Sequence, residues 1–130
     1  SLPEVEDFVS SKLLGPTLIT RVAANRMRLM MTEGSILNVV SMPAPATDRE
    51  RALTGVVRAA LATLTRGEAQ EWARDGIRIN RIGPRGQSGE ASAGAVLASD
   101  PDIAVLALHI ASKKGRQLSG YLFDSEGSAN

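Results

Sequence analysis

A strand, a long helix and a second strand follow one another between Gly34 and Pro84, and this order constrains the fold more than any other feature. The first strand is predicted at residues 36–40, a short and nearly continuous apolar run between Gly34 and Pro43. Such runs are typical of strands that are covered on both faces, as in parallel sheets. The sequence therefore predicts an α/β fold.

The helix between these strands has recognisable ends. Thr47 and Glu50 have the spacing of a capping box, in which each side chain binds the backbone of the other residue. Gly76 is the predicted C-cap, and the second strand is predicted at residues 77–82. An apolar stripe at helical spacing indicates the buried face of the helix; it consists of Leu53, Val56, Val57, Ala60, Leu61 and Leu64.

Further helices and a strand are predicted on either side of this unit. A helix is expected over residues 3–32, with a kink at Gly15-Pro16 because Pro16 lacks a backbone donor. Asp100 and Pro101 are typical of a helix start, and residues 121–123 favour a final strand. We therefore expect a single domain over residues 1–130, with a partial Rossmann-like parallel sheet of about three strands and long flanking helices.

Two segments of the unit carry a resemblance to a known family; they read GSILNVVS and, after the long helix, GIRINRIGP. They resemble the second half of the short-chain dehydrogenase/reductase family, where a strand ends in a catalytic Ser, Y-x-x-x-K follows on a long helix, and a G-I-R-V-N strand comes next. Residues 10–31 and 99–112 are similar to the family's dimer-forming helix and its last helix, and SGYLFDSEG resembles its closing strand. The resemblance covers nearly the whole chain.

The resemblance implies which residues occupy the family's catalytic positions. Ser41 retains the Ser, whereas Thr54 replaces the Tyr, Arg58 replaces the Lys and Lys12 replaces an Asn. The family Tyr exchanges a proton with the substrate because an adjacent ammonium lowers its pKa from about 10. A Thr hydroxyl has a higher pKa and a shorter reach, and Arg does not deprotonate usefully. These substitutions predict that the family's proton transfer is lost.

The resemblance also bears on the cofactor. The sequence contains no G-x-x-x-G-x-G segment after a first strand, which in the family binds the nicotinamide dinucleotide. We therefore expect no cofactor for this chain alone, and NAD(P) if an upstream half exists. The glycines between Gly83 and Gly94 are interpreted as a loop rather than a phosphate site.

The composition of the chain restricts the classes of partner and ligand that can be expected. With 15 basic and 14 acidic residues the net charge is +1, which gives no reason to expect nucleic acid or an anionic membrane. Cysteine is absent, so disulfides and thiolate metal ligands are excluded, and the single histidine, His109, predicts no metal site. No apolar run approaches the ~20 residues that span a bilayer. These features favour a cytoplasmic protein.

Three functional hypotheses remain open. The chain is a degenerate dehydrogenase-like module, without catalysis by itself, that acts in dimerisation or assembly through residues 3–32 and 47–75. Alternatively, it is the C-terminal part of a longer NAD(P)-dependent oxidoreductase whose nucleotide-binding half lies upstream. The third hypothesis is a separate enzyme that uses other chemistry at Ser41, although a Ser without a paired base lacks the geometry for nucleophilic catalysis.

Overall fold

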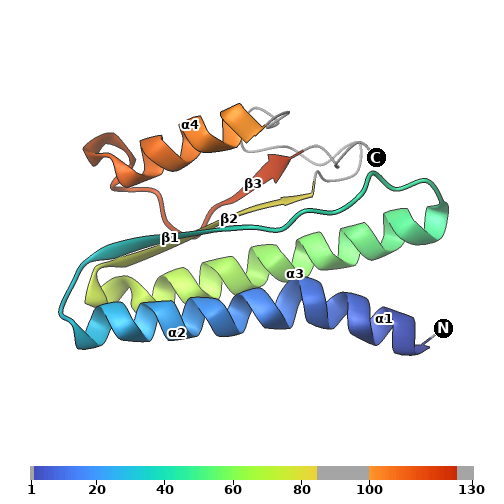
Figure 1. Cartoon of the computed structure of the whole chain (residues 1–130), viewed down its shortest axis with the longest axis horizontal. Helices are drawn as coiled ribbons and strands as arrows, with labels where there is room; N and C mark the ends of the chain where they lie inside the picture. The colour runs from blue at the N-terminus through green and yellow to red at the C-terminus, as the bar shows by residue number, and fades with distance from the viewer. Residues whose placement is uncertain (1, 85–99, 126–130) are drawn as a thin grey trace.

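A parallel sheet with helices on both faces forms the structure, a computed structural model that describes residues 2–84 and 100–125 (Figure 1). The 3-stranded sheet has the order β1 (Gly34–Val39), β2 (Ile77–Pro84) and β3 (Leu122–Ser125). β2 pairs in parallel with both neighbours. The α/β class, the parallel sheet and the long flanking helices predicted from the sequence are confirmed.

The helices lie in two layers, one on each face of the sheet (Figure 1). α2 and α3 cover one face, and α4 (Asp100–Ala111) covers the other. Within the described residues, no helix combines the length and the hydropathy that crossing a membrane requires.

The first helical segment consists of three consecutive pieces. These are α1 (Leu2–Val9), the π-helical turn η1 (Ser10–Leu14) and α2 (Gly15–Leu29). The interruption predicted at Gly15-Pro16 is the π-helical turn η1 directly before Gly15, and Pro16 falls in the first turn of α2, a position that tolerates proline. The helix also ends before the predicted residue 32, because Met31 has a φ of 53°.

The ends of α3 (Asp48–Trp72) agree with the sequence prediction. The Thr47 hydroxyl accepts a hydrogen bond from the Glu50 N–H at 3.2 Å, and the Glu50 carboxylate accepts one from the Thr47 N–H at 3.1 Å. At the other end, a short 3₁₀ turn leads to Gly76, whose φ of 69° confirms it as the C-cap.

The buried face of α3 is only partly the predicted one. Val57 and Leu61 are buried, but Val56 is 60% exposed. Two threonines, Thr54 and Thr65, are buried instead. Each hydroxyl donates to the carbonyl four residues earlier, at 2.9 Å for Thr54 and 2.5 Å for Thr65. Because these bonds satisfy the hydroxyls locally, the threonines are buried without an unpaired polar group.

Two apolar clusters hold the helices on the sheet. The first lies between α2, α3 and the beginning of the sheet, and its buried members are Ala24, Ala69, Ile77 and Ile79. The second lies near the carboxyl ends of the strands, and its buried members are Val40, Met42, Val57 and Leu61. This second cluster positions the residues at the predicted catalytic positions.

Candidate functional site

Lys12 and Ser41 lie together at the carboxyl end of β1. Lys12 extends from η1, and its Nζ donates a hydrogen bond to the Ser41 backbone carbonyl at 2.6 Å. π-helical turns occur frequently at functional sites, because the extra residue changes the direction of a side chain. The contact uses the backbone of Ser41, so it does not make the lysine a base for the hydroxyl.

Thr54 is enclosed in the protein and uses its hydroxyl within α3. Its side chain belongs to the buried face of the helix, and the hydroxyl proton is directed to the Glu50 carbonyl at 2.9 Å. No hydrogen bond among the described residues joins Thr54 to Ser41. The structure therefore brings Lys12 to Ser41 but does not link Thr54 to that pair.

Arg58, one turn further along α3, is tied to the ends of two strands. Its NH1 group donates to the Pro84 carbonyl at 2.9 Å and forms an ion pair with Asp124 of β3. The two side chains are only 17% and 3% exposed. Sequence reasoning missed Asp124; its signal is a lone acidic residue within a strand whose neighbours are mostly apolar.

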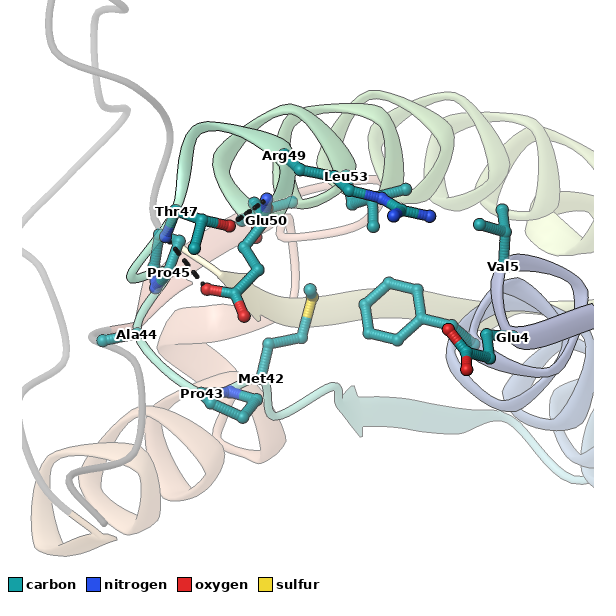
Figure 2. A pocket seen from close by; sticks show the side chains of 12 residues that line it. Glu4, Val5, Met42, Pro43, Ala44, Pro45, Thr47, Arg49, Glu50 and Leu53 are labelled. Atoms are coloured by element: carbon teal, nitrogen blue, oxygen red, sulfur yellow. Dashed lines mark hydrogen bonds between the residues drawn. The ribbon is translucent and has the colours of Figure 1, made fainter. Parts of the chain in front are cut away.

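A cavity of about 400 Å³ lies beside Thr54, between α1, the segment after β1 and the start of α3 (Figure 2). Its volume falls within the roughly 300–1,000 Å³ of small-molecule sites. Thr54 lines the cavity, but Ser41, Lys12 and Arg58 do not. Most of the lining is apolar, from Val5, Phe8, Met42, Pro43, Pro45 and Leu53.

Apart from Glu4 of α1, the polar side chains of this cavity belong to the start of α3. The Ala46 and Thr47 backbone N–H groups hold the pKa of Glu50 below its ordinary value, because they bind the ionised carboxylate. The side chain of Arg49 extends between those of Leu53 and Val5 in Figure 2. No group of three or more His, Cys, Asp or Glu residues in the described part of the chain could hold a metal ion.

Comparison with known proteins places this geometry in a family. The family model described as enoyl-(acyl carrier protein) reductase matches residues 1–117. The structure also superimposes on a short-chain type dehydrogenase/reductase from Mycobacterium marinum with a TM-score of 0.71, at 18% sequence identity. The chain belongs to the short-chain dehydrogenase/reductase family. The resemblance seen in the sequence is confirmed.

Other relatives show how much of a family member the chain represents. A galactitol 2-dehydrogenase of Rhizobium johnstonii is 39% identical over 64 residues, which are 48% of this chain and 25% of that protein. A 4-hydroxyisoleucine dehydrogenase complexed with NADH and succinate has a TM-score of 0.70 at 24% identity. The match covers 98% of this chain and 59% of that one. The chain thus spans less than two thirds of the relatives it matches.

Proposed function

We propose that this chain is a short-chain dehydrogenase/reductase module that has lost the family's Tyr–Lys chemistry and acts in dimerisation or assembly. The observation that carries the proposal is the Arg58–Asp124 ion pair, whose side chains are 17% and 3% exposed. A charge at the family's Lys position is here part of a structural contact between α3 and β3. It is not directed at a proton donor.

The hydroxyl at the Tyr position supports the same proposal. Thr54 donates its proton to a helix carbonyl, and its side chain is too short to reach a substrate as a phenol does. A general acid must lie within hydrogen-bond reach of the reacting group and have a pKa near the working pH. The Thr54 hydroxyl has a far higher pKa than a phenol, so proton transfer at this position is not expected.

The nicotinamide cofactor that the family implies does not fit the residues present. Where the family's compact ammonium holds the nicotinamide ribose, this chain has a planar guanidinium fixed on Pro84 and Asp124. We therefore propose that the chain by itself binds neither NADH nor NADPH. We also propose, from its composition, that it is a cytoplasmic protein.

Titration of the chain with NADH and NADPH tests this proposal by calorimetry. We expect no measurable binding to the wild type. The variant that combines Thr54→Tyr with Arg58→Lys should also show no ketone reduction above a protein-free control, because the hydride carrier lacks its site. Micromolar binding of either cofactor by the wild type, or turnover by the double variant, would contradict the proposal.

A second function is supported by the length of the matches. The superposition on the Mycobacterium marinum dehydrogenase/reductase covers 98% of this chain and 56% of that one. The chain therefore aligns with only part of that protein. The alternative proposal is that it forms the C-terminal part of a longer NAD(P)-dependent oxidoreductase. The intact mass of the protein isolated from its source decides between the two: a polypeptide about twice as long favours the alternative.

The assembly role rests on the outer face of the helical layer. On α2, Leu18, Val22 and Leu29 are 51%, 72% and 64% exposed, and Val56 of α3 is 60% exposed. Apolar surface of this kind is stabilised when a partner covers it. In the family, the corresponding helices pair with their copies across a two-fold axis. We propose a homodimer formed by α2 and α3.

A further inference from the structure

A second cavity lies at the opposite end of the sheet, where the strands begin. It has a volume of about 710 Å³ and is lined by residues within 33–35, 73–78 and 111–119. Because all strands are parallel, this end is separated by the length of the sheet from Ser41, Thr54 and Arg58. Its walls come from the turns before β1 and β2 and from the segment after α4.

The charge of this cavity is positive. Its lining contains the cationic side chains of Arg78, Lys113 and Arg116 and one carboxylate, that of Glu33. None of these four side chains takes part in an ion pair within residues 2–84 and 100–125. Like charges that face one hollow repel one another, and a bound anion removes that repulsion.

Arg78 gives the cavity a fixed cation. Its NH1 group donates to the carbonyls of Ile110 at 2.7 Å and Gly115 at 2.6 Å, so the guanidinium is held in one orientation. The bond to Ile110 also caps the carbonyl end of α4, whose partial negative charge would otherwise oppose an anion. Gly115 permits the arrangement, because a Cβ there would collide with the backbone of His109 and Ile110.

A hydroxyl donor complements the cations. Ser119 Oγ accepts a hydrogen bond from the Ile79 N–H at 3.1 Å, which leaves its own proton for a ligand oxygen. Ser119 and Ser35 both line the cavity. Oxyanions with several oxygens bind strongly to such sets of guanidinium, ammonium and hydroxyl donors.

We propose that this cavity binds a small oxyanion of the phosphate or pyrophosphate class through Arg78, Lys113 and Arg116. The site is built from segments that all belong to this chain. It does not depend on the chemistry at the other end of the sheet, so it stands whether or not the chain has lost its catalytic function.

Calorimetric titration of the whole chain with inorganic pyrophosphate, at constant ionic strength, tests the proposal. We expect binding that is weakened about tenfold or more when Lys113→Gln is combined with Arg116→Gln, since two of the three cationic donors are removed. Both side chains are exposed, so the double variant should fold. Lys114→Gln is the matched control, because Lys114 is exposed on the same turn but does not line the cavity.

Thermal unfolding provides a second measurement. Pyrophosphate should raise the melting temperature of the wild type and of Lys114→Gln, and it should raise that of the double variant much less. The proposal is overturned if the wild type shows no binding, if sodium chloride of equal ionic strength stabilises the chain equally, or if the double variant binds as the wild type does.

Discussion

Arg81 is the least expected residue of the core. Its side chain is 0% exposed in the central strand, on the same face as Ile77 and Ile79. Its NH2 group pairs with Glu68 at 2.9 Å, and its NH1 group donates to Thr65 at 3.1 Å. Burial raises the pKa of Glu68, and the Arg81 guanidinium opposes this rise. The pair joins α3 to β2, and each buried charge is compensated by the charge of its partner.

Removing one partner of this pair should be far more costly than removing both. In Glu68→Leu, the guanidinium of Arg81 remains buried without its carboxylate, and we expect a loss of about 3–5 kcal/mol in the free energy of unfolding. Adding Arg81→Met should recover most of that loss. Urea unfolding followed by circular dichroism measures both variants.

Glu71→Leu is the control for this comparison, because Glu71 lies on the exposed side of the same helix turn. An unfolding midpoint for Glu68→Leu that equals the midpoint of Glu71→Leu would show that the buried pair has no special role.

The sequence predicted some of these residues and not others for a physical reason. The family spacing identifies Thr54 and Arg58, because positions on one helix follow from their separation along the chain. Asp124 and Arg81 pair with residues far away in the sequence, and a strand pattern read alone does not reveal these partners. Long-range ion pairs therefore require the three-dimensional structure.

The helices and strands themselves were predicted more completely than their ends. The capping box and Gly76 mark α3 because these signals are local. The end of α2 depends instead on the left-handed conformation of Met31, which methionine rarely adopts, so residue type does not mark that end. The π-helical turn η1 lies directly before Gly15-Pro16, where the sequence predicted an interruption, but the sequence did not predict that the interruption is a π-helical turn.

The capping box of α3 predicts a pH dependence. The pKa of Glu50 is lowered from 4.5, mainly by the Ala46 N–H. The ionised carboxylate therefore stabilises the folded chain above pH 4.5, and this stabilisation is lost as the pH falls through the lowered pKa. Glu50→Gln retains the shape of the side chain and lacks the charge.

Melting temperatures of the wild type and Glu50→Gln, measured from neutral to acidic pH, test this prediction. The wild type should be more stable at neutral pH, and the difference should shrink as the carboxylate is protonated. A difference that stays constant throughout the acidic range would contradict the assigned role of Glu50.

Two glycines should respond in opposite ways to alanine. Gly76→Ala places a Cβ on a residue with a φ of 69°, and we expect a loss of about 1–2 kcal/mol. Gly67 lies in the middle of α3, where a Cβ meets nothing within 4 Å. Gly67→Ala should therefore stabilise the chain by about 0.5–1 kcal/mol, since glycine weakens a helix. Denaturant unfolding measures the change in the free energy of unfolding for both variants. A loss of stability in Gly67→Ala would contradict the prediction.

The whole molecule has two ends with different character. At the carboxyl ends of the strands, an apolar cavity lined by Thr54 lies near the buried ion pair of Arg58 and Asp124. At the amino ends, three cations that form no ion pair within the described residues line a larger cavity. The strand, helix and strand order predicted the parallel sheet that creates this division. That order of elements could not predict the cationic cavity, because its walls come from three segments that are distant from one another in the sequence.

The outer helical face gives the last prediction. Ala59 is exposed on α3, near the exposed Val56, so a glutamate there should be tolerated in a folded monomer. In the proposed homodimer the same glutamate would enter an apolar seam between helices, where an unpaired charge is strongly disfavoured. We expect the wild type to sediment as a dimer and Ala59→Glu to dissociate at least about tenfold more readily. Ala104→Glu, at an exposed position of α4 on the opposite face of the sheet, should remain dimeric. Sedimentation over a range of concentrations distinguishes the three proteins, and a wild type that stays a folded monomer at high micromolar concentration rules out assembly through α2 and α3.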